Sequence, residues 1–281
     1  MIIFKKTEDL RSYLAGKKAK NAQVGFIPTM GALHAGHLSL VEKSRKDSSI
    51  TVCSIFVNPT QFNDPKDFEK YPSTIEGDIT QLEAVGCEAL FLPSTREIYG
   101  DDTGTEPHFE IGYLEHILEG KYRPGHFQGV CQVMSLLLDI VQPDRLYLGQ
   151  KDYQQCMVID RLVELLGMRE TRVMIAPTLR EADGLAMSSR NIRLNKEERA
   201  KAPAIYESLL YIKEHLEKGE TSSVENQART KLDQRGFRTD YIEIADAETL
   251  QSVEVWDGKR KLVIVAASFL GEVRLIDNLI V

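Results

Sequence analysis

The sequence has no apolar run that approaches the ~18 residues needed by a membrane-spanning helix. Its first residues, MIIFKKTEDL, are interrupted by Lys5 and Lys6 before they could form the apolar stretch of a secretory signal. Internal repeats and low-complexity segments are also missing. These absences exclude a membrane-spanning protein, and they predict a soluble protein of the cytoplasm.

Cysteine is scarce as well. The four cysteines, Cys53, Cys87, Cys131 and Cys156, are scattered and never show the CxxC spacing of a zinc or redox site. Three of them lie in apolar, strand-like or helix-like segments, so we expect buried free thiols. A chain of this kind belongs in a reducing compartment.

An excess of basic residues is missing too. The chain has 35 Lys and Arg against 42 Asp and Glu, which gives a formal charge of -7. Binding to nucleic acid is driven by cationic neutralisation of phosphates, so the charge balance predicts no nucleic-acid partner. The P-loop pattern GxxxxGK[ST], a common cradle for γ-phosphate transfer, does not occur.

What the sequence does contain is an alternation of short apolar strands with amphipathic helices over its first 176 residues. Because both faces of a parallel sheet are covered by helices, such strands are apolar throughout, and the alternation predicts a Rossmann-like parallel sheet. The predicted strands span residues 24–28, 49–57, 88–92, 145–148 and 171–176, and the predicted helices span 38–46, 74–85, 129–141 and 153–166.

The pattern changes after Pro177. One helix is predicted from about Lys196, with Ile205, Leu209 and Ile212 on its apolar stripe, and a second over residues 222–234. Strand patterns follow at 241–245, 262–269 and 273–279. We therefore predict two domains, a Rossmann-like domain at 1–176 and a smaller α+β domain at 177–281.

The first chemical motif is FIPTMGALHAGHLSL at residues 26–40, where a strand leads through a glycine turn into a helix. A helix N-terminus with free backbone N–H groups favours a bound anion. His34 and His37 lie three residues apart, so both can project from the first turn and donate to phosphate. The alternative is that both histidines merely cap the helix. The HxGH spacing directly after a buried strand favours a role for both histidines in phosphate binding.

Two further segments supply cations. LREADGLAMSSRN (179–191) places two serines and Arg190 in a polar run after an Asp-Gly turn, an arrangement suited to a phosphate clamp. LGQKDYQQ (148–155) follows a predicted strand, at the edge where open α/β sheets bind ligands, and it contains Lys151. Taken alone, either segment could be an ordinary solvated surface.

Together these motifs resemble the nucleotidyltransferase superfamily, in which HIGH-like and KMSKS-like elements act on ATP. The second element departs from that form, because the Met187–Arg190 run has no leading lysine. Lys151 could supply the missing cation.

The full series of motifs resembles the pantothenate synthetase family, the ligases that join pantoate to β-alanine. PTMGALHAGHLSL (28–40), FVNPTQF (56–62), YRPGHFQGV (122–130), LGQKDYQQ and LREADGLAMSSRN occur in the order and spacing of that family. The resemblance covers essentially the whole chain and is least specific over the last 80 residues. It implies ATP and Mg²⁺, pantoate and β-alanine as small-molecule substrates, and a homodimer.

The resemblance also implies roles for particular residues. His34, His37 and Lys151 would be catalytic. Gln61, Gln155 and Arg123 would bind the acid and amine substrates, and Asp78 with Gln81 would support Mg²⁺ and pyrophosphate. The implied ATP site consists of Met30, Gly31, His34, His37, Gly149, Lys151, Asp152, Leu179, Met187, Ser188, Ser189 and Arg190.

Activation of a carboxylate on such a site is expected to proceed through attack on the α-phosphorus of ATP, followed by amine attack on the acyl adenylate. Three alternatives remain open at this point. They are a nucleotidylyltransferase that stops at the nucleotidyl product, an RNA-binding fragment of a tRNA synthetase, and a silent nucleotide sensor. The paired glutamines, Gln61 and Gln155, and the full motif series argue against the first. The charge balance disfavours the second, and the complete set of motif residues disfavours the third.

Overall fold

The computed structural model describes residues 1–101 and 107–281. The chain divides into two compact units. The first consists of Met1–Gly149 and Gln155–Pro177, and the second consists of Gln150–Gln154 and Thr178–Val281. The second unit therefore contains five residues, 150–154, that interrupt the first unit along the chain. The sequence pattern did not predict this discontinuity.

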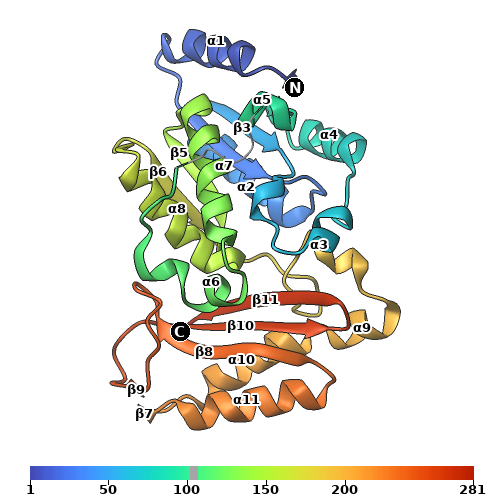
Figure 1. Ribbon diagram of the computed structural model, residues 1–281, viewed down its shortest axis with the longest axis vertical. Coiled ribbons are helices and arrows are strands. Elements are labelled where there is room, and N and C mark those ends of the chain that lie inside the picture. The colour runs from blue at the N-terminus through green and yellow to red at the C-terminus, as the bar shows by residue number, and fades with distance from the viewer. Residues whose placement is uncertain (102–106) are drawn as a thin grey trace. The chain divides into compact units, whose positions relative to one another are not determined.

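The first unit is built on a six-stranded parallel sheet (Figure 1). Its strand order is β1 (Ile2–Phe4), β4 (Ala89–Phe91), β3 (Ile50–Ile55), β2 (Val24–Thr29), β5 (Arg145–Gly149) and β6 (Arg172–Ala176). Every residue of β3 is buried, as expected for a strand covered on both faces. The predicted Rossmann-like sheet is confirmed.

The strand order places a topological switch between β2 and β5. From β2 the chain moves outward through β3 to β4, and it later returns to β5 on the other side of β2. Open α/β sheets bind ligands outside the carboxyl ends of the strands at such a point. The residues that follow β2 are therefore in the position where a ligand site is expected.

The helices of this unit include all those predicted, with shifts of a few residues at their ends. Helix α7 buries eleven of its sixteen residues and so lies deep in the unit. The elements are α1 (Thr7–Lys18), α2 (Ala35–Asp47), η1 (Pro59–Gln61), α3 (Pro65–Glu69), α4 (Ile75–Ala84), α5 (Thr95–Tyr99), η2 (Gly112–Glu115), α6 (Leu118–Tyr122), α7 (His126–Val141) and α8 (Tyr153–Leu165), the last of which begins in the second unit.

The second unit contains an antiparallel sheet of β8 (Arg238–Asp246), β10 (Leu262–Leu270) and β11 (Val273–Ile280), with β10 in the centre. Helices α10 (Ala204–His215) and α11 (Ser222–Gln234) contribute to the apolar core that covers this sheet, for example through Leu209 and Leu232. The unit also contains η3 (Gln150–Asp152), η4 (Ser189–Arg193), α9 (Lys196–Lys201) and a short pair, β7 (Gly219–Glu220) with β9 (Val255–Trp256). The predicted α+β architecture is confirmed.

The prediction of a single helix that begins near Lys196 is wrong in one respect. The structure has two helices there, α9 and α10, which are separated at Ala202 and Pro203. Proline lacks the N–H that a continuous helix needs and is favoured at a helix start, so Pro203 ends one pattern and begins the next.

All four cysteines are buried and free of disulfides. Burial raises the pKa of the Cys87 thiol to about 11 and that of Cys131 to about 12. Thiolates are the reactive form of cysteine, so these thiols are inert packing groups, as the sequence predicted.

Candidate active site

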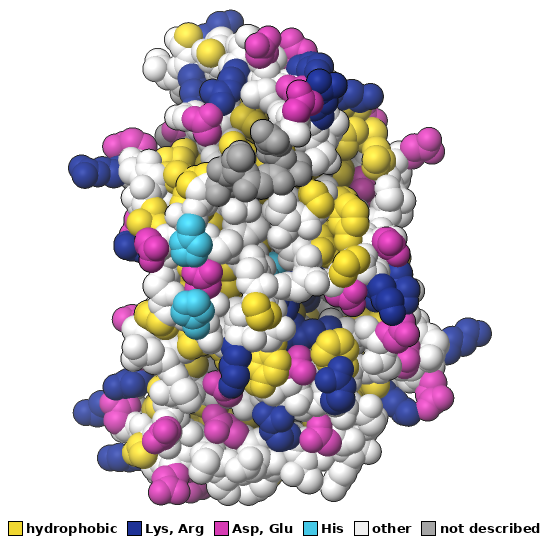
Figure 2. All heavy atoms as spheres, in the orientation of Figure 1, with side chains coloured by type: hydrophobic (Ala, Val, Ile, Leu, Met, Phe, Trp, Pro, Cys, Tyr) yellow, Lys and Arg dark blue, Asp and Glu magenta, His cyan; other side chains and the backbone are white. Residues whose placement is uncertain are grey.

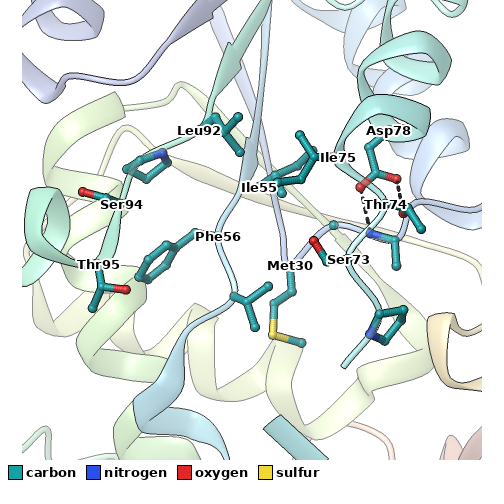
Figure 3. A pocket seen from close by; sticks show the side chains of 15 residues that line it. Met30, Ile55, Phe56, Ser73, Thr74, Ile75, Asp78, Leu92, Ser94 and Thr95 are labelled. Atoms are coloured by element: carbon teal, nitrogen blue, oxygen red, sulfur yellow. Dashed lines mark hydrogen bonds between the residues drawn. The ribbon is translucent and has the colours of Figure 1, made fainter. Parts of the chain in front are cut away.

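A pocket of about 350 Å³ lies at the carboxyl ends of β2, β3 and β4 in the first unit (Figure 3). Apolar side chains such as Ile55, Phe56 and Leu92 form much of its wall, and hydroxyl groups of Ser94 and Thr95 stand at one side. Met30 lines the pocket directly after β2. The pocket therefore lies beside the turn that leads from β2 into the HxGH motif.

The turn after β2 has an unusual backbone. Gly31 has φ of +81° and Ala32 has φ of +48°, so both residues are in the left-handed region. A Cβ on Gly31 would lie 3.0 Å from Ile55 Cγ2 and 3.1 Å from Asp78 Oδ2. Glycine is therefore required here by both conformation and space.

Asp78 of α4 holds this turn. Its Oδ2 accepts the Ala32 N–H at 2.9 Å (Figure 3), and its Oδ1 accepts the Leu33 N–H at 2.8 Å. The hydroxyl of Thr74 donates a third hydrogen bond to Oδ1 at 3.0 Å. The Asp78 carboxylate is fully buried, and three donors aimed at it offset the cost of burying its charge.

The turn takes up most of the hydrogen-bonding capacity of Asp78. Three of the four lone-pair positions of its carboxylate accept hydrogen bonds, so at most one is left for a metal ion such as Mg²⁺. Gln81 lies one turn further along α4 and is half-buried. Within residues 1–101 and 107–281, no group of three or more His, Cys, Asp and Glu side chains is arranged to hold a metal ion.

The two histidines of the HxGH motif do cap helix α2. His34 is the N-cap residue, and its Nδ1 accepts the Gly36 N–H at 3.1 Å. The Nδ1 of His37 accepts the His34 N–H at 3.4 Å, which completes a capping box. The ring centroids are 4.0 Å apart. From the sequence, capping and function were alternatives, and the geometry makes them compatible.

The capping bonds fix the tautomer of both rings. A nitrogen that accepts a hydrogen bond has no proton, so in each neutral imidazole the proton is on Nε2. Each ring therefore has an Nε2–H donor directed away from its own cap. A helix N-terminus that presents two such donors side by side is suited to an oxyanion.

The Gln61 amide contacts the side chain of Met30. Its Nε2 is 3.0 Å from Met30 Sδ, and its Oε1 accepts from Asn58 Nδ2 at 3.2 Å. Asn58 is itself fixed, because its Oδ1 accepts the hydroxyl of Tyr99 at 2.7 Å and its Nδ2 also donates to the Gly129 carbonyl at 3.1 Å. The Gln61 amide thus presents its NH₂ group toward Met30.

Helix α7 packs against the turn that contains Thr60 and Gln61. A Cβ on Gly129 would lie 2.4 Å from the Thr60 carbonyl oxygen, so only glycine allows this close approach. His126 Nδ1 lies 2.8 Å from the Gln61 carbonyl oxygen, and its Nε2 lies 3.1 Å from Arg123 Nη1. Arg123 therefore reaches the Gln61 turn through His126, and it also pairs with Glu119 at 3.6 Å.

Gln155 lies in the first turns of α8 and is half-buried. Gly149 is the last residue of β5, and a Cβ there would meet nothing within 4 Å. These two residues belong to the first unit, whereas the residues between them belong to the second.

In the second unit, Lys151 and Asp152 lie in the turn η3, where their side chains form a loose ion pair at 3.8 Å. Asn278 of β11 donates to the carbonyl oxygens of Gln150 and Lys151. The hydroxyl of Tyr153 donates to the Ala247 carbonyl at 2.6 Å. These bonds explain why the segment that follows β5 belongs to the second unit.

The predicted phosphate clamp follows a small hairpin. Met187 N–H donates to the Leu179 carbonyl at 3.0 Å, and Arg180 pairs with Ala186 in an antiparallel bridge. Ser188 is the N-cap of η4, and its Oγ accepts the Arg190 N–H at 3.3 Å. The structure thus brings together Leu179 with Met187, and Ser188 with Arg190; Ser189 is the first residue of η4.

Several supporting residues were missed by sequence reasoning. They are Asn58, His126, Arg180, Asp277 and Asn278, which act on the motif residues by hydrogen bonding. Asn58, His126 and Arg180 lie inside the quoted motifs, but their local sequence does not distinguish them from the other polar residues there. Asp277 and Asn278 lie in the segment where the family resemblance is least specific.

On the face of the molecule drawn in Figure 2, acidic and basic side chains are interspersed. Among the residues that the structure describes, no helix combines the length and apolar character needed to span a membrane.

Comparisons with known proteins agree with one another. The family model described as pantoate-beta-alanine ligase matches residues 2–280. A pantothenate synthetase of Thermosipho africanus is 45% identical over 287 residues, covering 100% of both chains, and one of Cytophaga hutchinsonii is 42% identical over 284 residues, covering 100% of this chain and 99% of the relative.

Solved structures give the same result. The pantothenate synthetase of Thermus thermophilus has a TM-score of 0.90 at 40% identity and covers 99% of each chain. The pantoate-beta-alanine ligase of Francisella tularensis, complexed with beta-gamma ATP and beta-alanine, has a TM-score of 0.81 at 38% identity and covers 99% of this chain and 97% of that one. The chain belongs to the pantoate–β-alanine ligase family.

Proposed function

We propose that this protein condenses pantoate with β-alanine through a pantoyl-adenylate intermediate, using ATP and releasing AMP and pyrophosphate. The observation that carries the proposal is the HxGH capping box at the N-terminus of α2, in which both Nδ1 atoms accept backbone N–H groups, so that the proton of each neutral ring is on Nε2. The related Francisella tularensis ligase was solved in complex with beta-gamma ATP and beta-alanine, which supports these two substrates.

In the first step, a carboxylate oxygen of pantoate attacks the α-phosphorus of ATP and pyrophosphate leaves. Negative charge grows on the phosphate oxygens, and prearranged donors stabilise it. His34 and His37 supply N–H donors, and Lys151 and Arg190 supply positive charge. In the second step, the amine of β-alanine attacks the activated carbonyl carbon, loses a proton and expels AMP. No covalent enzyme intermediate is required.

The acid substrate is assigned to the region of Met30 and Gln61. The pocket behind Met30 is apolar and suits a branched carbon skeleton, while the oriented Gln61 amide suits a hydroxyl or carboxylate. Gln155 is the second amide of this proposed site, and Arg123 acts through His126 on the Gln61 turn. A site built from amides rejects analogues that lack the hydroxyl groups, because its polar groups would remain unpaired.

The remaining ATP contacts are proposed from the motifs. They are Met30, Gly31, Gly149, Asp152, Leu179, Met187, Ser188 and Ser189. Mg²⁺ is proposed to be carried chiefly by the phosphates of ATP, since Asp78 is committed to the turn after β2. A homodimer in the cytoplasm is part of the proposal, and the association state can be measured by analytical ultracentrifugation.

Oxygen-18 transfer tests the proposed route. Pantoate labelled in its carboxylate should pass one labelled oxygen to AMP, because the attacking oxygen stays on the α-phosphorus when the amine displaces the nucleotide. Mass spectrometry of the products measures this directly. Release of ADP with label in inorganic phosphate would show an acyl-phosphate route and would overturn the proposal.

The order of the steps has its own test. If the adenylate forms before the amine reacts, exchange of labelled pyrophosphate into ATP requires pantoate and proceeds without β-alanine. Exchange that starts only when β-alanine is added would exclude the stepwise scheme.

A further inference from the structure

The side chain of Asn278 holds the backbone on both sides of Lys151. Its Nδ2 donates to the Gln150 carbonyl at 2.9 Å and to the Lys151 carbonyl at 2.9 Å. These carbonyls belong to the two peptide planes that flank the Lys151 α-carbon. Fixing both planes fixes the two backbone dihedrals of Lys151, and therefore the direction in which its side chain leaves the backbone.

A third bond orients the Asn278 amide. Its Oδ1 accepts from Gln150 Nε2 at 3.1 Å, so its NH₂ group is the part that faces the two carbonyls. Asn278 is 3% exposed. All the hydrogen-bonding atoms of this amide therefore have defined partners within one unit.

The preceding residue, Asp277, holds the hairpin that precedes the phosphate clamp. Its carboxylate forms two hydrogen bonds with Arg180, at 2.6 Å and 2.9 Å, and the Arg180 guanidinium lies 3.6 Å from the centroid of the Tyr206 ring. Arg180 also donates to the Gly184 carbonyl at 3.1 Å. A bidentate guanidinium–carboxylate pair has a fixed geometry, so the start of the hairpin is placed relative to β11.

Asp277 also lies in the electrostatic field of Lys151. Burial raises the pKa of the Asp277 carboxyl, whereas Arg180 and, more weakly, Lys151 act in the opposite direction. The two cationic segments therefore share one buried acidic neighbour.

We propose that Asp277 and Asn278 are positioning residues for adenylate formation, which hold Lys151 and the segment that leads to Ser188–Arg190 in one fixed arrangement. The inference rests on the proposed function, because that function makes Lys151 and Arg190 phosphate ligands. No motif of the sequence assigns a role to either residue.

The test is the pre-steady-state rate of pantoyl-adenylate formation in Asn278→Ala at saturating ATP and pantoate. Loss of both carbonyl bonds frees the Lys151 backbone, and a misplaced catalytic group costs up to about 10²-fold in rate. We expect a fall of about 10- to 100-fold.

Two matched variants act as controls. Gln150→Ala removes only the third bond and should lower the rate by less than about threefold. Leu275→Ala, in the core of the same unit, lowers stability but removes no hydrogen bond to residues 150 and 151, and it should leave the rate unchanged below its melting temperature.

A double-mutant cycle separates positioning from a general structural effect. If Asn278 acts through Lys151, then Asn278→Ala causes no further loss in a Lys151→Ala background. Independent losses that multiply in the double variant, or a normal rate in Asn278→Ala, would overturn the inference. A normal rate in Lys151→Ala would instead refute the proposed role of Lys151, and the positioning of that lysine with it. The oxygen-18 experiment remains a separate test of the reaction itself.

Discussion

The turn after β2 and the turn after β5 are both held by a buried side chain distant in sequence, but by opposite chemistry. At Ala32 and Leu33 the Asp78 carboxylate accepts two N–H groups, across 46 and 45 residues. At Gln150 and Lys151 the Asn278 amide donates to two carbonyls, across 128 and 127 residues. Each side chain matches the backbone groups that its turn presents: the carboxylate accepts from N–H groups, and the amide donates to carbonyls.

The comparison shows why a charged side chain is tolerated at position 78 and a neutral one is found at position 278. The Asp78 charge is balanced by three donors, none of which is cationic. Asn278 is neutral and lies next to Asp277, which already has a cation in Arg180. A second carboxylate at position 278 would face two carbonyl dipoles and an existing negative charge, so an amide is the side chain that fits.

The largest effect is expected for Asp78→Ala. It removes the carboxylate that accepts the Ala32 and Leu33 N–H groups, and hydrogen bonds to a charged partner contribute about 1.5–3 kcal/mol each. We expect a clear loss of stability in chemical denaturation and slower adenylate formation. Glu76→Ala, at an exposed site on the same helix, is the control. Recovery of the Asp78→Ala rate at high Mg²⁺ would contradict this account and make Asp78 a metal ligand.

Next comes the ion pair beside Asn278. Arg180→Met leaves the Asp277 carboxylate buried without its cation, which costs about 3–5 kcal/mol, whereas Arg180→Met with Asp277→Leu should recover most of that loss. Burial raises the Asp277 pKa and Arg180 opposes that rise, so in Arg180→Met the protonated carboxyl becomes the form tolerated in the fold. The deficit of Arg180→Met should therefore shrink as pH falls. A deficit that grows at low pH would show that another group controls it.

A smaller loss of stability is expected when the glycine before each turn is replaced by alanine, and the loss should differ between Gly31 and Gly149. Gly31→Ala forces a side chain into the left-handed region and against Ile55 and Asp78, at a cost of about 1–3 kcal/mol. Gly149, before the other turn, has open space around its Cβ position and no positive φ. Gly149→Ala should leave the thermal unfolding midpoint nearly unchanged. Equal losses of stability in Gly31→Ala and Gly149→Ala would contradict the claim that only the first position requires glycine.

The smallest effect is expected for Thr74→Val, which removes one of the three donors to Asp78 and keeps the shape of the side chain. The backbone bonds remain, so stability should fall by about 0.5–1.5 kcal/mol and adenylate formation should change little. A loss as large as that of Asp78→Ala would mean that Thr74, rather than the backbone, fixes the carboxylate.

The sequence was sufficient to predict the sheet and most helices, because strands such as β3 are apolar on both faces and helices such as α7 have a long apolar surface. It missed several short elements, such as α3, α5 and α6, and also β1 and α1. β1 has only three residues and becomes a strand through its pairing with β4, and Lys5 and Lys6 interrupt the apolar pattern between β1 and α1. Strand order is a property of the tertiary fold, which a local pattern does not contain.

The candidate site was predictable where its chemistry is local. His34 and His37 are recognisable from their spacing, and they meet as a capping box three residues apart. In the sequence alone Asp78 resembles an exposed helical acid, and only the folded chain shows it buried against the turn after β2. Asn278 had no signal at all, because its partners lie more than a hundred residues away.

The discontinuity of the second unit has a consequence for recombination between relatives. Residues 150–154 are encoded inside the first unit but pack with residues 178–281. A chimera joined near Pro177 would take its Gln150–Lys151 turn from one parent and its Asn278 from the other. A crossover that respects the structure must therefore exchange the short segment and the C-terminal part together, as one inherited block.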